Sequence, residues 1–290
     1  MKKAIKELNY KLESIVVNPI NFQSEIKKYQ NIDVCFNALH GPYGEDGTIQ
    51  KVLLNNNLKF THSGTKASKY AFNKYLTKLA ISKTAINCLE SIQLNKKKII
   101  KGFFLKCFNK IGAFVLKPIS SGSSFGVKIF RSMRDIDIFF DNFNKEIIIY
   151  KNHNHFMIEP YINGRELTVG VIEEEGNSKP IEVTEIISKN NFYDYEAKYT
   201  KGISKHVLPA VVPSKIYNNC LSNAKIIHDI LGCKGVSRSD FLFDEKNNEL
   251  FFLEINTQPG LTPLSLVPEQ LNFNNINFTL FIDKLINSSL

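Results

Sequence analysis

The chain has 290 residues, 43% of them hydrophobic and 22% charged, which suits two or three domains that each bury a core. Lysine and arginine number 37 against 28 for aspartate and glutamate, so the formal net charge is +9. No apolar run approaches the roughly 20 residues of a membrane span, and the first residues alternate charged with apolar side chains instead of forming a secretion signal. The sequence therefore predicts a globular cytoplasmic protein with no membrane partner.

The five cysteines are widely scattered, with no C-x-x-C pair and no histidine at zinc-finger spacing. We interpret them as reduced thiols. The positive charge is diffuse, and the densest basic run, KKKIIK at 96–101, fits a solvated helix face or loop better than a phosphate track. A basic nucleic-acid module is a distant alternative, and we expect no nucleic-acid partner.

The first half of the chain alternates helix and strand signals. Apolar residues at helical spacing predict helices over 4–12, 22–30, 49–57 and 67–82. Short apolar runs predict strands over 14–17, 31–39 and 58–60. This alternation predicts a parallel sheet, with the glycine-rich HGPYGEDGT segment at the carboxyl end of one strand.

From about residue 88 the pattern changes to strands with hairpin turns. Strands are predicted over 89–94, 112–118, 126–130, 155–162, 166–174, 181–187, 235–243 and 250–256. Helices are predicted near 97–110, 134–143 and 214–231, with a helix pair at the C-terminus. The polar, aromatic segment 190–202 has the length of a functional lid or of a disordered loop.

Four polar residues on the last two predicted strands form the clearest constellation. Arg238 and Asp240 lie two apart on one strand, and Glu254 and Asn256 lie two apart on the next, so each pair shares a sheet face. If these strands pair, two carboxylates and an amide oxygen converge, which suits Mg²⁺ bound together with substrate phosphates. A plain surface ion pair is the alternative, although the apolar neighbours make unpartnered carboxylates costly there.

A glycine-serine hairpin, GSSFG at 122–126, follows a predicted strand. Its glycines allow backbone N–H groups to approach an anion, and Ser123 and Ser124 add hydroxyl donors. Lys117 precedes the hairpin, and Lys74 on the 67–82 helix is a second cationic candidate. Taken alone, the hairpin fits a mere turn and Lys74 a solvated helix lysine, so phosphate binding is one of two interpretations here.

Six segments, in this order and spacing, resemble the D-alanine–D-alanine ligases of the ATP-grasp superfamily. They are HGPYGEDGTIQ (40–50), THSGTKASKYAFNKYLTK (61–78), KPISSGSSFGV (117–127), IEPYINGRELTVGV (158–171), FYDYEAKY (192–199) and SRSDFLFDEKNNELFFLEINTQPGLTPLSLVP (237–268). The resemblance covers nearly the whole chain from about residue 30. It implies a mixed α/β ATP-grasp fold with a truncated Rossmann-like N-terminal domain (1–64), a central domain (65–160) and a C-terminal domain (161–290) that carries the 190–202 lid.

The resemblance also implies a reaction and a set of residue roles. ATP would phosphorylate the carboxylate of one D-alanine, and the amine of a second D-alanine would attack the acyl phosphate. Matched residues toward ATP are Lys74, Lys117, Ser124 and Lys198 near the phosphates, Glu159 at the adenine and Glu166 at the ribose. Matched metal ligands for Mg²⁺ or Mn²⁺, with two ions expected, are Asp240, Glu254 and Asn256.

The remaining implied roles concern the two amino-acid subsites. Arg238 and the backbone N–H of Gly260 match the oxyanion donors, and Ser123 and Tyr193 match a hydrogen-bonding network beside the first D-alanine. Substrate contacts are expected from His40, Tyr199, Ser265 and Leu266. The FYDYEAKY pattern favours dipeptide over depsipeptide formation, and the family's habit suggests a homodimer.

One feature of the family pattern is missing. The family opens with a strand and a G-G-x-S-x-E-R-E-V-S turn whose glutamate positions the first D-alanine, and we expect about 20 to 30 residues to be absent here. A misassigned start codon or an artificially truncated chain fits better than a degenerate paralogue, because every downstream catalytic position is intact. The alternatives to a D-alanine–D-alanine ligase are an impaired Mg-ATP-binding paralogue and an ATP-grasp ligase for another amino acid.

Overall fold

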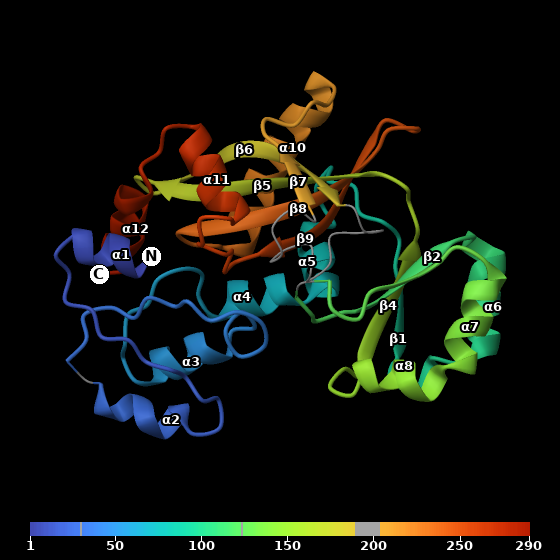
Figure 1. Cartoon of the computed structure of the whole chain (residues 1–290), viewed down its shortest axis with the longest axis horizontal. Coiled ribbons are helices and arrows are strands. Elements are labelled where there is room, and N and C mark those ends of the chain that lie inside the picture. Colours follow the sequence, from blue (N-terminus) through green and yellow to red (C-terminus); the bar gives the residue numbers. More distant parts are fainter. Residues whose placement is uncertain (30, 123, 189–203) are drawn as a thin grey trace.

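Two antiparallel β-sheets organise the chain, and helices cover their outer faces (Figure 1). The computed structural model describes residues 1–29, 31–122, 124–188 and 204–290. The smaller sheet has four strands in the order β1-β4-β2-β3, and the larger sheet has five in the order β7-β6-β5-β8-β9. The mixed α/β class expected from the sequence is confirmed.

The strands after residue 88 lie where the sequence predicts them. The smaller sheet contains β1 (Ile92–Asn95), β2 (Phe114–Pro118), β3 (Lys128–Phe130) and β4 (His155–Pro160). The larger sheet contains β5 (Arg165–Glu174), β6 (Asn177–Ser188), β7 (Ser204–Val207), β8 (Val236–Asp244) and β9 (Glu249–Asn256). Only β7 lacks a sequence prediction, because its four residues are too few to show a period.

Each segment with helical periodicity contains a helix. Those before the smaller sheet are α1 (Lys2–Glu7), α2 (Phe22–Glu25), the 3₁₀ helix η1 (Ile26–Lys28), α3 (Thr48–Asn55), α4 (Thr65–Phe72) and α5 (Lys74–Ile81). The later ones are η2 (Lys96–Lys98), α6 (Lys101–Ile111), α7 (Met133–Asp141), α8 (Phe143–Ile149), α10 (Ser214–Leu231), α11 (Leu266–Phe273) and α12 (Phe278–Asn287).

The predicted 67–82 helix is broken at Asn73. This residue is extended, with φ −104° and ψ 101°, and its side chain caps α5 by accepting a hydrogen bond from the Leu76 N–H. The Lys74 N–H donates to the Ile119 carbonyl at 3.0 Å, so α5 begins against the turn that follows β2. The break therefore turns the first residue of α5 toward the glycine-serine hairpin.

The larger sheet is covered on both faces. Along β5, Leu167 and Val169 pack in a core with α4, α5 and α10, whereas Ile172 packs in a core with α1, α11 and α12. This alternation is the two-residue period of a strand, and cover on both faces explains why β5 reads as an almost continuous apolar run. The two chain termini meet at this second core, where α1 lies beside α12 (Figure 1).

The smaller sheet is covered by helices on one face. Phe114 and Leu116 of β2 and Phe156 of β4 lie in an aromatic core with α6, α7 and α8. The intervening residues Lys117 and Glu159 point to the other face, toward the larger sheet. The strand period thus places an apolar set in the core and a charged set between the sheets.

The sequence predicts a parallel sheet in the first 60 residues, but the parallel pairing in the structure is much shorter. Residues 14–17 form no strand, and 31–39 and 58–60 meet only in an isolated parallel bridge between Cys35 and Phe60. The Cys35 N–H donates to the Lys59 carbonyl at 2.8 Å, and the Thr61 N–H donates to the Cys35 carbonyl at 3.0 Å. Among the described residues these two parallel segments have no further strand neighbour, and a single pair gains too few hydrogen bonds to extend.

The described residues contain no helix that is long and apolar enough to cross a membrane. All five cysteines are free thiols, as the sequence predicts. The domain boundaries at 64 and 160 stay a prediction.

Gln270 joins α11 to an irregularity in the larger sheet. The pairing of β5 with β6 shifts register between Val169 and Val171, which takes the Gly170 N–H out of the regular ladder. The fully buried Gln270 accepts from this N–H at 2.8 Å and donates to the Thr168 carbonyl at 3.2 Å. A Cβ on Gly170 would lie 2.7 Å from Gln270 Oε1, so the contact also requires glycine.

Gln270→Leu should lower the free energy of unfolding by about 3 kcal/mol, because it leaves the buried Gly170 N–H and Thr168 carbonyl without this partner. Urea denaturation of the wild type and the variant measures the difference. Gln93→Leu, on an exposed position of β1, is the matched control. Equal stability of the two variants would contradict this role of Gln270.

Candidate nucleotide and metal site

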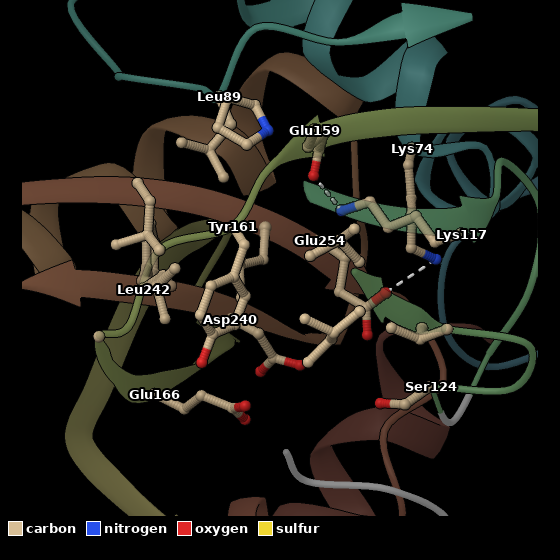
Figure 2. Close-up of a pocket in the computed structure, with 18 of the residues that line it drawn as sticks. Lys74, Leu89, Lys117, Ser124, Glu159, Tyr161, Glu166, Asp240, Leu242 and Glu254 are labelled. Carbon is tan, nitrogen blue, oxygen red and sulfur yellow. Dashed lines mark ion pairs between the residues drawn. The ribbon is translucent and has the colours of Figure 1, made fainter. Parts of the chain in front are cut away.

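A pocket lies between the inner face of the smaller sheet and the larger sheet (Figure 2). Its apolar lining includes Leu89, Val115 and Ile186. Its charged and hydroxyl-bearing lining, among the described residues, consists of Lys74, Lys117, Ser121, Ser124, Glu159, Tyr161, Glu166, Asp240 and Glu254. The structure places seven of the candidate ATP and metal residues in this pocket. They come from separate segments of the chain, which the two sheets bring together.

The register of β8 with β9 aligns the four polar residues singled out by spacing. Asp240 lies opposite Glu254, and Arg238 lies opposite Asn256. Arg238 donates to both carboxylate oxygens of Asp240, at 2.9 and 2.7 Å, and Thr168 donates to Asp240 Oδ1 at 2.6 Å. The Arg238 and Asp240 side chains are only 12% and 18% exposed, so this is a part-buried ion pair, of which Asp240 lines the pocket.

Lys74 connects three elements at the same end of the pocket. Its ammonium group lies 2.9 Å from Glu254 Oε2 and donates to the Ser121 carbonyl at 2.7 Å (Figure 2). Lys74 is buried, and its position at the start of α5 follows from the break at Asn73. The carboxylates of Asp240 and Glu254 are thus each neutralised by a cationic side chain.

Glu159 is the most buried charged group of the pocket. It contacts the ammonium group of Lys78 through Oε1 and that of Lys117, at 2.5 Å, through Oε2. Burial raises the pKa of the Glu159 carboxyl, but the Lys117 and Lys78 ammonium groups outweigh burial and hold that pKa below its ordinary value. Burial and the neighbouring Lys117 charge hold the pKa of Lys78 below its ordinary value, although Glu159 raises it. Glu159 is therefore ionised at neutral pH.

The glycine-serine hairpin is anchored from behind. Gly126 has φ +74°, and a Cβ there would lie 2.9 Å from a ring carbon of Tyr150, so only glycine fits. The Tyr150 hydroxyl donates to the Gly126 carbonyl at 3.0 Å. Ser124 lines the pocket, whereas Ser123 lies outside the described residues.

The HGPYGEDG loop faces the hairpin from the N-terminal side. A Cβ on Gly122 would lie 3.4 Å from Glu45 Oε2, which places Glu45 beside the hairpin. His40 Nδ1 lies 3.4 Å from Glu45 Oε1, at the edge of an ion-pair contact. His40 is thus near the hairpin through Glu45, although it does not line the pocket between the sheets among the described residues.

The segment after β9 brings Gly260 and Ser265 together. A Cβ on Gly260 would lie 2.7 Å from Ser265 Oγ, and Ser265 Oγ accepts from the Thr262 N–H at 3.2 Å. Leu266, buried, begins α11. These candidates for the second amino-acid subsite form a cluster of their own, apart from the lining of the pocket described above.

The oxygen ligands near β8 and β9 suit a divalent cation. The described residues contain no group of three or more His, Cys, Asp or Glu side chains that could hold a metal ion. Asp240 and Glu254 supply two facing carboxylates, and Asn256 Oδ1 accepts from the Gln258 N–H at 2.7 Å while keeping a second lone pair. Two carboxylates with cationic partners fit Mg²⁺, which takes one or two carboxylates and completes its shell with water and phosphate.

Four candidates lie outside the described residues: Ser123, Tyr193, Lys198 and Tyr199. The whole of the expected lid at 190–202 also lies outside the described residues, within the range 189–203. Their roles stay predictions.

Sequence reasoning missed two residues of the site. Lys78 lies one helical turn after Lys74, and this i, i+4 spacing was the available signal. Thr168 lies opposite Asp240 on β5, a pairing that only the sheet order reveals. Both contact a carboxylate of the pocket.

Comparisons with known proteins show the family of the chain. Residues 3–63 match the family model described as D-ala D-ala ligase N-terminus, and residues 111–287 match that described as D-ala D-ala ligase C-terminus. The D-alanine–D-alanine ligase of Rickettsia massiliae is 39% identical over 293 residues, covering 100% of this chain and 85% of that protein. The ligase of a Wolbachia strain from Drosophila simulans is 41% identical over 291 residues, covering 100% and 87%.

Solved structures show the same fold. The D-alanine–D-alanine ligase of Bacillus anthracis matches with a TM-score of 0.79 at 25% identity, covering 98% of this chain and 87% of that chain. A structure of the Bacillus anthracis ligase complexed with ATP matches with a TM-score of 0.78 at 24% identity, covering 99% and 89%.

The two sheets with a charged pocket between them are those of an ATP-dependent ligase with the ATP-grasp fold. The family assignment rests on the matches along both parts of the chain. The chain belongs to the D-alanine–D-alanine ligase family.

Glu159→Gln should lower the free energy of unfolding at pH 7 by about 3 kcal/mol, because it leaves two buried ammonium groups without their carboxylate. The pKa of Glu159 is lowered in the folded state, so its stabilisation is present above the ordinary glutamate value of about 4.3 and is lost as the pH falls through the folded-state pKa. The difference between wild type and variant should therefore shrink from pH 7 to pH 3.

Urea unfolding at a series of pH values measures this difference. Glu90→Gln, at an exposed position, is the control and should leave the stability nearly unchanged. A Glu159→Gln difference that stays constant over the whole pH range would show that the carboxylate is not the titrating group.

Proposed function

We propose that this chain joins two D-alanine molecules at the expense of ATP, with the nucleotide in the pocket between the two sheets. The observation that carries this proposal is the gathering of Lys74, Lys117, Glu159, Asp240 and Glu254 around one pocket of a chain that belongs to the ligase family. Two lysines suit a polyphosphate, and the carboxylates suit the cation that accompanies it.

Each end of the pocket has a distinct chemistry. At one end Glu159 is a buried acceptor among apolar side chains such as Leu89 and Val115, which suits the amino group and faces of adenine. At the other end Lys74 and the glycine-serine hairpin meet the Asp240 and Glu254 carboxylates, which suits the phosphates. Glu166, on β5, would then face the ribose.

Asp240, Glu254 and Asn256 would hold Mg²⁺ or Mn²⁺, with two ions expected from the family resemblance. The ions, when bound, neutralise the negative charge on the phosphate oxygens. Binding would require Lys74 and Arg238 to give up carboxylate contacts, and both side chains would then be released toward phosphate and substrate oxygens.

The reaction has two steps. The carboxylate of the first D-alanine attacks the γ-phosphorus of ATP, which forms an acyl phosphate and releases ADP. The amine of the second D-alanine attacks the acyl carbon, loses a proton and expels phosphate. Arg238 and the Gly260 N–H would donate to the oxyanion of this step, and each aligned donor contributes about 3 kcal/mol. Ser265 and the Leu266 N–H, at the start of α11, would hold the second carboxylate.

The remaining family roles enter as proposals of the same kind. Ser123, Tyr193, Lys198 and Tyr199 would complete the substrate region, with 190–202 as its lid. The boundaries at 64 and 160 would delimit three domains, of which the second and third contribute one sheet each to the nucleotide site. A homodimer and a cytoplasmic location stay predictions.

The proposal is tested by supplying D-alanine, ATP and Mg²⁺ to the purified chain. Equal amounts of D-alanyl-D-alanine and ADP should form, as measured by chromatography of the products. Replacing the second amino acid by D-lactate should give little depsipeptide. ADP release without dipeptide would favour an impaired paralogue, and a product only with another amino acid would favour a different ligase.

Glu254→Gln should reduce metal-dependent ligation at least about 100-fold, because a carboxylate that would hold the cation beside the phosphates is lost. Glu249→Gln, at an exposed position on the same strand, is the matched control and should leave the rate unchanged. Steady-state ADP release measures both variants. Wild-type turnover in Glu254→Gln would make this carboxylate a structural partner of Lys74 only.

A further inference from the structure

Lys78 is a buried cation to which the proposed reaction assigns no role. Its ammonium group contacts Glu159 Oε1 and donates to the Leu89 carbonyl at 2.9 Å. Glu159 and Leu89 line the pocket, whereas Lys78 is not among the described residues of that lining. Lys78 therefore stands behind the pocket wall and can act on a ligand only through its two partners.

The placement of Lys78 is a consequence of helix geometry. Lys74 and Lys78 lie one turn apart on α5, so both face the same side of that helix. Lys74 reaches Glu254 on the larger sheet, and Lys78 reaches Glu159 on the smaller sheet. One helix face thus supplies an ammonium group to each end of the pocket.

Stability does not explain a lysine at this position. Lys78 is 9% exposed, and burying an ammonium group costs several kcal/mol that its partners only offset. Lys117 already provides Glu159 with a cationic partner at 2.5 Å. We therefore expect a second buried lysine on the same carboxylate where that carboxylate must stay ionised and keep one orientation.

The two lysines determine what Glu159 can accept. Lys78 binds Oε1 and Lys117 binds Oε2, so the carboxylate is held from both oxygens. An ionised carboxylate has no proton to donate, and each oxygen keeps a further lone pair for a ligand N–H. Such a group attracts an exocyclic amino group and repels a carbonyl oxygen at the same place.

The partner at Leu89 fixes the opposite side of this end of the pocket. The neighbouring Cys88 forms a parallel bridge with Phe252 of β9, and the Phe252 N–H donates to the Asn87 carbonyl at 2.9 Å. Lys78 thus ties the segment 87–89, which is bound to the larger sheet, to a carboxylate of the smaller sheet. The spacing between Leu89 and Glu159 depends on this bridge.

We propose that Lys78 is a positioning residue that holds Glu159 as an oriented, acceptor-only carboxylate and thereby sets a preference for a 6-aminopurine nucleotide over a 6-oxopurine nucleotide. The inference rests on the proposed location of the nucleotide base at Glu159. It assigns a selectivity function to a side chain that touches no substrate.

The test compares binding of ADP and GDP to wild type, Lys78→Met, Glu159→Gln and the double variant by titration calorimetry. Lys78→Met should lower the ADP-over-GDP preference about tenfold, because the acceptor loses its fixed orientation. The KM for D-alanine should change less than about twofold, which separates base selectivity from a general loss of structure. Lys83→Met, exposed just beyond α5, removes the same charge and should bind as the wild type does.

Two results would overturn the proposal. One is an unchanged ADP-over-GDP preference in Lys78→Met. The other is a Lys78→Met loss that is fully retained in the Glu159→Gln background, because a residue that acts through Glu159 has no effect once the carboxylate is gone. If Lys78→Met does not fold, Lys78→Leu, which also removes the donor to Glu159, replaces it under the same two criteria.

Failure of the proposed function gives a different pattern. A wild type that binds ADP but forms no dipeptide would contradict the ligase activity, while its ADP-over-GDP preference would still test Lys78. A wild type that binds neither nucleotide would contradict both.

Discussion

The site depends on the mutual neutralisation of buried charges at the junction of the two sheets. Lys74 pairs with Glu254, Arg238 pairs with Asp240, and Glu159 lies between two lysines. A carboxylate or an ammonium group in this setting would cost several kcal/mol without a partner. The pairs therefore allow a dense set of charges to exist in a part-buried pocket.

The two sheets make these pairs possible because each offers one charged face to the other. On the smaller sheet, Phe114 and Leu116 face the helices while Lys117 faces the pocket. On the larger sheet, the β8–β9 register brings Asp240 opposite Glu254. Helix α5 lies between the sheets and reaches both with side chains one turn apart. A single short helix thus supplies a lysine partner to a carboxylate of each antiparallel sheet.

Most of the site could be predicted from the sequence where a local period determines the outcome. The two-residue spacing on β8 and β9 correctly aligned the Asp240 and Glu254 positions, since strand pairing leaves little freedom once both strands are recognised. Helix positions also followed from apolar periodicity. The family resemblance then indicated the substrate, which the composition alone could not indicate.

The sequence did not predict correctly the features that depend on tertiary contacts. The break at Asn73 depends on the turn after β2, and no local pattern in a strongly periodic helix announces it. The sequence alone indicates a solvated helix lysine at Lys78, and only the structure shows its contact with Glu159. The predicted parallel sheet near Cys35 was overestimated, because a strand signal says nothing about how many neighbours the strand will find.

We propose that a cation replaces Lys74 and Arg238 as the partner of the Glu254 and Asp240 carboxylates, and that the phosphates bind beside it. A crystal structure of the chain with Mg²⁺ and a non-hydrolysable ATP analogue tests it most directly. The account predicts the base beside Glu159, the cation on Asp240 and Glu254, and the Lys74 ammonium group moved from Glu254 to a phosphate oxygen. An analogue bound outside this pocket, or one bound inside it with the Lys74–Glu254 pair intact and no cation on either carboxylate, would contradict it.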